Sequence, residues 1–479
     1  MTSGPYLIGI DGGTQSTKVV VVDAKGRVVA EGRQALRPTS RPAHGVVFHP
    51  DDDLWDSLAA ASREAMAQFD GDPREIAAVG LCTIRCCKAF LRDDGSLVEP
   101  VISWMDDRAY QAYLPDDPAV AYATTSSGYL GHRLTGEHRD SAANNILLQW
   151  PIDVDRWDWS DDAVLFKRFR VRREQLFELQ LPGEIIGSMT PAAATATGIP
   201  AGLPVVSTAN DKAVEALGAG PIGETTALVS LGTYIAAMVP GHENHEGAAS
   251  FWTNFGASPH RYLYESLGVR RGMWTLSWFL DLLGPELVER AASLGASREE
   301  LIEAEAGGVP AGSDGLMTVL DWLAPTDAPY RKGVMLGFDA RHTRGHVYRS
   351  ILEAIALTMK HNVDAMGRDL GITIEEIVVG GGGASSPLFM QTFADVFGIP
   401  ATRSTGPAGA GLGAAICAAA AAGIYPDIET ATARMTGERE SFAPDAANTA
   451  IYALMNETVY QAIRAATDPL LERSFPIFH

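Results

Sequence analysis

The chain has 479 residues, of which 46% are hydrophobic and 20% charged, and its formal net charge is -21. This composition is that of a globular protein, and the length exceeds what one hydrophobic core usually supports, so we expect two domains. The acidic charge leaves no broad basic face, which argues against nucleic acid and anionic membrane surfaces as partners.

The first residues predict two strands joined by a glycine-rich turn. Residues 6–10 are apolar, residues 18–22 are rich in β-branched side chains, and residues 11–14 between them read Asp-Gly-Gly-Thr. This turn suits MgATP. Its carboxylate, on Asp11, would lie beside the Mg²⁺ ion, its two glycines would let a phosphate approach the backbone, and its threonine offers a hydroxyl donor. The same tetrapeptide also fits an ordinary hairpin turn, so it does not decide the function alone.

Charged groups that follow apolar runs are candidates for contacts to substrate hydroxyls. They are Arg85, which is followed by Cys86, and Asp106, which comes shortly after Trp104. The alternative is that the charged groups lie on the surface and that the cysteine is a small core residue. A helix over residues 53–69, with a strand after it, makes this half an α/β chain.

Asp211 stands where a predicted strand gives way to a helix. The strand begins at residue 205, and small residues that favour a helix follow from Ala213. Ligands of α/β proteins bind at such strand ends, where a carboxylate would accept the proton of an attacking hydroxyl, as a kinase aspartate does. Because Asn210-Asp211 is also ordinary helix-cap chemistry, both interpretations stay open.

The strand-turn-strand pattern recurs in the second half of the chain. Residues 226–229 and 234–239 are predicted strands around residues 230–233, which read Ser-Leu-Gly-Thr. The recurrence predicts two related lobes that each present a hairpin to a shared cleft. Backbone N–H groups and the Thr233 hydroxyl would then hold the phosphate chain from the side opposite Asp11, which favours phosphoryl chemistry over two plain turns.

A glycine run further on is a candidate adenosine site. Residues 346–366 have helical spacing, residues 377–379 predict a buried strand, and residues 380–384 (Gly-Gly-Gly-Gly-Ala) lead into a helix over 386–397. Glycines without Cβ atoms let a flat ligand lie on the backbone next to a helix N-terminus. The alternative is a flexible loop.

Residues 404–426 carry no charge over a length that would span a bilayer. They consist of Gly, Ala and Pro with few large apolar residues, so we predict a close-packed internal helix. No signal peptide is expected at the N-terminus. The four cysteines resemble neither a disulfide framework nor a zinc site, and a reducing cytoplasm fits them best.

Together these motifs resemble the FGGY carbohydrate kinases, the family of xylulokinase and glycerol kinase. Residues 8–14 are similar to the family's first phosphate motif, residues 230–233 to its second, and residues 381–386 to its adenosine motif. The C-terminal signature is nearly complete over residues 333–353. The resemblance implies two ribonuclease-H-like lobes of the actin/hexokinase-like ATPase fold around a central cleft, with residues 1–221 and 222–479 as the lobes.

The resemblance also implies roles for single residues. Asp211 becomes the catalytic base, and Asp11 and Asp211 lie near the metal. Substrate contacts fall on Arg85, Cys86, Trp104, Asp106 and Lys212. The residues expected to bind ATP are Gly12, Gly13, Thr14, Gln15, Ser16, Lys18, Gly232, Thr233, Gly381, Gly382, Gly383, Ala384 and Ser386.

Three departures from the family pattern concern the acceptor side. Lys212 follows the base where Asn or Gln is common. Arg85-Cys86 agrees with glycerol kinases at its first position and with neither glycerol kinases nor xylulokinases at its second. The span from Trp104 to Leu134 is about thirty residues shorter than expected.

The resemblance implies an ATP- and Mg²⁺-dependent kinase of a small ketose, such as the pentulose xylulose. Glycerol, erythritol or another short polyol is the alternative acceptor. A non-catalytic, actin-like nucleotide-binding regulator is the alternative of another class, because one two-lobed scaffold hosts several functions. A homodimer is expected by resemblance alone.

Overall fold

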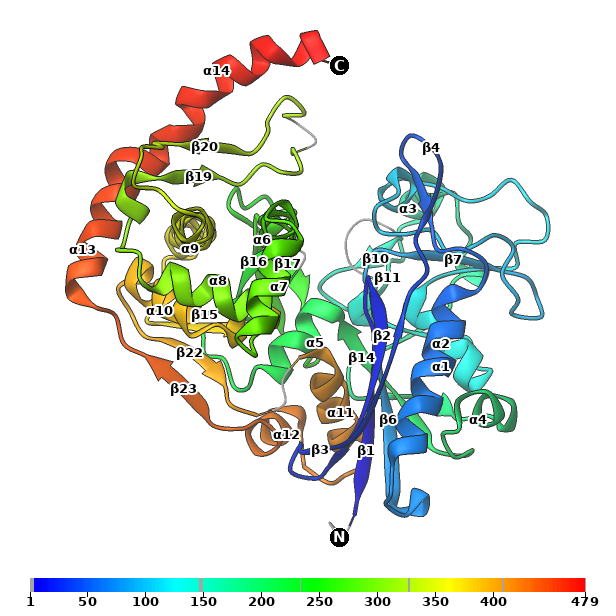
Figure 1. The fold of residues 1–479 in the computed structure, drawn as a ribbon. Helices are drawn as coiled ribbons and strands as arrows, with labels where there is room; N and C mark the ends of the chain where they lie inside the picture. The colour runs from blue at the N-terminus through cyan, green and yellow to red at the C-terminus, as the bar shows by residue number, and fades with distance from the viewer. Residues whose placement is uncertain (1–3, 146–149, 233, 326–327, 407–408, 479) are drawn as a thin grey trace.

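The computed structural model describes residues 4–145, 150–232, 234–325, 328–406 and 409–478, and two large sheets form the cores of two lobes (Figure 1). The first sheet has the order β13-β14-β6-β1-β2-β3. Its strands are β1 (Tyr6–Gly12), β2 (Ser16–Asp23), β3 (Val28–Ala35), β6 (Ile76–Thr83), β13 (Ile185–Ser188) and β14 (Pro204–Asn210).

The second sheet has the order β17-β18-β16-β15-β21-β22-β23. Its strands are β15 (Thr226–Leu231), β16 (Ile235–Gly241), β17 (Phe251–Phe255), β18 (Tyr262–Ser266), β21 (Glu376–Gly380), β22 (Ala401–Ser404) and β23 (Arg439–Phe442). Both sheets contain an antiparallel hairpin whose first strand also pairs with a parallel strand. In the first sheet β1 pairs with β2 and with β6, and in the second β15 pairs with β16 and with β21. The recurrence seen in the sequence is therefore a recurrence of structure, and the predicted hairpin strands are confirmed.

Helices cover both sheets. They are α1 (Asp53–Gln68), α2 (Ser126–Thr135), α3 (Ala163–Phe169), α4 (Pro191–Thr197), α5 (Asp211–Gly218), α6 (Gly272–Leu282), α7 (Pro285–Ser293), α8 (Arg298–Gly307), α9 (Arg344–Leu370), α10 (Pro387–Phe397), α11 (Ala410–Ala421), α12 (Ile428–Met435), α13 (Ala446–Met455) and α14 (Gln461–Phe478). The helices expected near residues 53–69, 346–366 and 386–397 are thus confirmed as α1, α9 and α10.

Short strands complete the fold outside the two main sheets. They are β4 (Ser40–Ala43), β5 (Val46–Phe48), β7 (Lys88–Leu91), β8 (Tyr122–Thr125), β9 (Arg139–Ser141), β10 (Ile152–Asp153), β11 (Asp158–Trp159), β12 (Glu178–Gln180), β19 (Met317–Val319) and β20 (Val334–Leu336). Trp157, in the turn between β10 and β11, stacks on Phe255 of the second lobe with ring centroids 4.1 Å apart. The β10–β11 hairpin therefore ties the two lobes together.

Helix α11 is the internal helix predicted within residues 404–426. Although it lies in the chain between β22 and β23 of the second sheet, it packs against β1, β6 and α5 of the first lobe (Figure 1). Glycines allow this approach, because a Cβ on Gly9 would lie 1.9 Å from the Gly411 carbonyl oxygen and one on Gly80 would lie 2.0 Å from that of Ala414. In the described part of the chain, no helix is long and apolar enough to cross a membrane.

Candidate active site

Asp11 lies in β1, one residue before the strand ends at the first turn. It pairs across the hairpin with Lys18, and the turn is closed by a hydrogen bond from Gly13 N–H to the Ser16 carbonyl oxygen at 3.1 Å. Burial, reinforced by the nearby carboxylates of Asp211 and Glu215, raises the pKa of Asp11 to about 7. A carboxyl group whose pKa is raised by neighbouring carboxylates lies in a region of negative charge, and such a region is suited to bind a cation.

The other predicted residues of the first turn are more exposed than Gly12, which is buried at the end of β1. Thr14 is partly buried and Gln15 is exposed, and Ser16 Oγ accepts a hydrogen bond from Arg33 Nε at 3.0 Å. Lys18 Nζ lies 3.2 Å from Glu31 Oε2 at the surface. Of the second turn, Gly232 is described, whereas Thr233 lies outside the described residues.

Asp211 is the first residue of α5, but it does not cap the helix. The cap is Asn210, whose Oδ1 accepts a hydrogen bond from Ala213 N–H at 3.2 Å. Asp211 Oδ1 is buried and has no hydrogen-bond partner among the described residues. Burial raises the pKa of Asp211 against the lowering effect of Arg85 and Lys212, and Glu215 and Glu265 add to the rise. This unpaired carboxylate oxygen is free to accept a proton.

Arg85 crosses the gap between the lobes. It forms a bidentate ion pair with Glu265 of β18, with Nη1–Oε2 at 2.6 Å and Nη2–Oε1 at 2.7 Å. Its guanidinium lies 4.9 Å from the ring centroid of Trp252 on β17. Arg85 is 17% exposed and Glu265 is 1% exposed, so the pair is shielded from water.

Lys212 also reaches the second lobe. Its Nζ donates to Ser230 Oγ at 2.6 Å and to Glu215 Oε2 at 3.1 Å. Ser230 Oγ in turn donates to the Glu215 carboxylate at 2.8 Å. Both cations next to Asp211 are thus already engaged by carboxylates.

Gly380 and Gly381 line a cavity of about 480 Å³ in the second lobe, together with Arg403, whereas Gly382 and Gly383 do not line it. At Gly381 the backbone has φ 81°, and a Cβ there would lie 2.6 Å from the Leu231 carbonyl oxygen. Gly381 and Ala384 line the cavity, while Ser386 does not: its hydroxyl caps α10 and bonds Glu303. Part of the glycine run thus lies at a cavity, and its role in adenosine binding stays a prediction.

Asp106 has a structural role that the sequence did not predict. Both of its oxygens accept two hydrogen bonds each, from Arg108 and from the N–H of Val47, and the side chain is fully buried. No acceptor capacity is left for a substrate hydroxyl. Trp104 differs, since its Nε1 is buried and has no hydrogen-bond partner in the described chain. Cys86 is buried with φ 62°, next to Arg85.

Three residues of this site were missed from the sequence. Glu215 lies one helical turn after Asp211, and this i, i+4 spacing on α5 was a usable signal. Glu265 and Trp252 lie on strands of the second lobe, far along the chain from Arg85, and no local pattern marks them.

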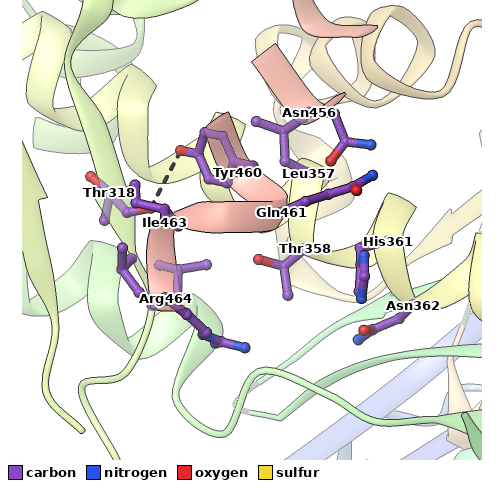
Figure 2. A pocket seen from close by; sticks show the side chains of 12 residues that line it. Thr318, Leu357, Thr358, His361, Asn362, Asn456, Tyr460, Gln461, Ile463 and Arg464 are labelled. Carbon is purple, nitrogen blue, oxygen red and sulfur yellow. Dashed lines mark hydrogen bonds between the residues drawn. The ribbon is translucent and has the colours of Figure 1, made fainter. Parts of the chain in front are cut away.

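A different cavity, of about 130 Å³, lies between α9 and the chain around the start of α14 (Figure 2). His361, Gln461 and Asn456 line it, and Tyr460 donates a hydrogen bond to the Thr318 carbonyl oxygen at 3.3 Å. None of the residues predicted from the motifs lines it.

Two family models match the chain along most of its length. The N-terminal domain of the FGGY family of carbohydrate kinases matches residues 6–114 and 118–218, and the C-terminal domain of that family matches residues 227–422. The chain is therefore a sugar kinase of the transferase class and belongs to the FGGY family of carbohydrate kinases, which use ATP as the phosphate donor.

Similar proteins agree with this assignment. The uncharacterized sugar kinase YgcE of Escherichia coli (strain K12) is 46% identical over 477 residues, covering 100% of this chain and 97% of that protein. The xylulose kinase of the same strain is 27% identical over 497 residues, covering 94% of this chain and 97% of that protein. The crystal structure of xylulose kinase from Rhodospirillum rubrum matches with a TM-score of 0.82 at 24% identity, covering 98% of this chain and 100% of that one. This likeness confirms the predicted two-lobed fold.

Proposed function

We propose that the chain transfers the γ-phosphoryl group of ATP to a hydroxyl of a small, uncharged ketose, with a pentulose such as xylulose as the first candidate. The observation that carries the proposal is Asp211, whose buried Oδ1 has no partner among the described residues and lies on the helix that faces the second hairpin. A kinase needs a proton acceptor beside the attacking hydroxyl group, and the rest of its catalysis is positioning and charge stabilisation.

The residues act in a single displacement. As the acceptor oxygen forms a bond to the γ-phosphorus, its proton passes to Asp211, while the bond from that phosphorus to the bridging oxygen breaks and its electron pair leaves with ADP. Backbone N–H groups of the two turns would stabilise the charge on the transferring group. Lobe closure would exclude water, which is itself a competent acceptor.

Asp11 is the residue that would hold Mg²⁺. Within the described chain, no group of three or more His, Cys, Asp or Glu side chains could hold a metal ion. A cation bound by one carboxylate, phosphate oxygens and water fits this arrangement, because Mg²⁺ keeps several waters. When bound, the ion would supply charge compensation for the phosphates.

The charges around Asp211 favour an uncharged acceptor. Arg85 is paired with Glu265 and Lys212 with Glu215, so neither cation offers an uncompensated charge to the carboxylate of a sugar acid. The Arg85–Glu265 pair can instead donate and accept hydrogen bonds to hydroxyl groups. Glycerol, erythritol or another short polyol stays the alternative acceptor, and a relative named glycerol kinase is 24% identical to this chain.

The remaining assignments are proposals of the same kind. The family models end at residue 218 and resume at residue 227, which supports a change of lobe between residues 221 and 222, with α11 returning to the first lobe. All four cysteines are free and buried, which supports a reducing cytoplasm. A homodimer is kept as an expectation.

The test is a coupled ADP-release assay with MgATP against ketoses, aldoses, polyols and glycerol. Asp211→Asn is assayed beside the parent protein. We expect one acceptor class to give a strong signal that falls by several powers of ten in the variant, while ATP binding is kept. Near-normal turnover in the variant would remove Asp211 from its role, and silence across the panel despite ATP binding would favour a nucleotide-binding regulator.

A further inference from the structure

Lys212 is the residue that departs most clearly from the family pattern, and its contacts point away from the acceptor. Its ammonium is hydrogen-bonded to Ser230, at the end of β15 where the second turn begins. A Cβ placed on Gly232, within that turn, would lie 4.0 Å from Lys212 Nζ. The ammonium therefore lies against the loop of the second lobe that is expected to hold phosphate.

The hydrogen bonding of this ammonium is incomplete. Lys212 Nζ has three donors, and the described residues use two of them, through Ser230 Oγ and Glu215 Oε2. The side chain is 13% exposed, so the third donor has little access to water. The ammonium is held in place by its ion pair with Glu215 Oε2 at 3.1 Å.

We propose, resting on the phosphotransferase function above, that Lys212 is a catalytic residue that binds the γ-phosphoryl group of ATP through its free donor, and not a contact to the acceptor. During transfer it keeps its proton. It stabilises the negative charge on the γ-phosphoryl oxygens while Asp211, one residue earlier, receives the proton of the acceptor.

Glu215 compensates the charge of the Lys212 ammonium when no phosphoryl group is bound. Without nucleotide, the ammonium is compensated by the Glu215 carboxylate directly and through Ser230. A Cβ on Gly380, at the edge of the adenosine cavity, would lie 3.6 Å from Glu215 Oε1, so this carboxylate faces the nucleotide side. Lys212 therefore also offsets the repulsion that Glu215 would exert on a triphosphate.

The test compares a nucleotide that carries a γ-phosphoryl group with one that lacks it. Calorimetric titration with Mg²⁺ measures the affinities of a non-hydrolysable ATP analogue and of ADP for the parent, Lys212→Gln and Lys212→Arg. For Lys212→Gln we expect the affinity for the analogue to fall about tenfold or more and that for ADP by less than about twofold. Lys212→Arg, which keeps the charge, is expected to restore most of the loss.

The matched control is Lys360→Gln. Lys360 also forms an ion pair with a carboxylate on its own helix, at 2.6 Å from Asp364 on α9, but belongs to no part of the proposed site. We expect it to change neither affinity. Thermal unfolding of each variant shows whether the protein remains folded.

Two results would overturn the assignment. Equal losses for the analogue and for ADP would mean that Lys212 does not sense the terminal phosphate. An unchanged analogue affinity with a raised KM for the acceptor would return Lys212 to the acceptor site. Because the titration needs no acceptor, it tests Lys212 even if the acceptor panel gives no turnover.

Discussion

Replacing Asp11 with asparagine should stabilise the ligand-free protein at alkaline pH. The folded state holds the pKa of Asp11 at about 7, against 3.8 for an unperturbed carboxyl group. The folded protein therefore binds one proton more than the unfolded chain between these values, and stability falls as the pH rises through this window. The raised pKa costs the folded state about 4 kcal/mol above pH 7, where Asp11 is ionised in both states. At pH 5 the cost is about 2 kcal/mol, because the ionised carboxylate of the unfolded chain must take up a proton on folding.

Asparagine resembles the protonated carboxyl and removes this cost. Urea unfolding of the parent and Asp11→Asn should show a stabilisation of about 4 kcal/mol at pH 8 that shrinks by roughly half at pH 5. The exposed Asp70→Asn serves as control and should show no such pH dependence. A stability difference that is the same at both pH values, or a loss of stability at pH 8, would refute the reasoning. The same variant should bind MgATP more weakly, since it lacks the carboxylate for the ion.

Two further variants test the cleft. Gly381→Ala places a Cβ 2.6 Å from the Leu231 carbonyl oxygen at a residue with positive φ, so the affinities for ATP and ADP should both fall about tenfold in titration. The control is Gly307→Ala, whose Cβ would meet nothing within 4 Å and which should leave both affinities unchanged. Glu265→Gln leaves the guanidinium of Arg85 buried without its charge partner and should lower Tm by about 3 °C, from a loss of about 3 kcal/mol. The control is Glu299→Gln, which removes the exposed partner of Arg298 and should lower Tm little. An unchanged Tm in Glu265→Gln would show that the Arg85–Glu265 pair is not shielded from water.

The sequence predicted what local patterns encode. Runs of apolar and β-branched residues with small turn residues between them marked both hairpins, and the strand that begins at residue 205 located Asp211 at a strand end. The glycine run after residue 379 located two residues that line a cavity, Gly380 and Gly381. These features are readable because each element forms from residues close together in the chain.

What the sequence did not show are pairs made by the approach of the lobes. Glu265 meets Arg85 across 180 residues of chain, and no spacing rule connects a loop after β6 with a strand of the other lobe. Asp106 looked like a free polar group after an apolar run, yet its oxygens hold Arg108 and the backbone at Val47. Whether a polar side chain faces a ligand or satisfies its own neighbours depends on contacts that only the folded chain reveals.

The return of α11 to the first lobe has a consequence for the order of folding during synthesis. The first sheet is complete in sequence at Asn210, but the helix that packs on β1 and β6 ends at Ala421. Until the ribosome has released that helix, one face of the sheet exposes Leu7, Val20 and Val22 to water. Although N-terminal domains generally fold first, the first lobe of this kinase must await nearly the whole chain, and a fragment ending at residue 221 would be prone to aggregate.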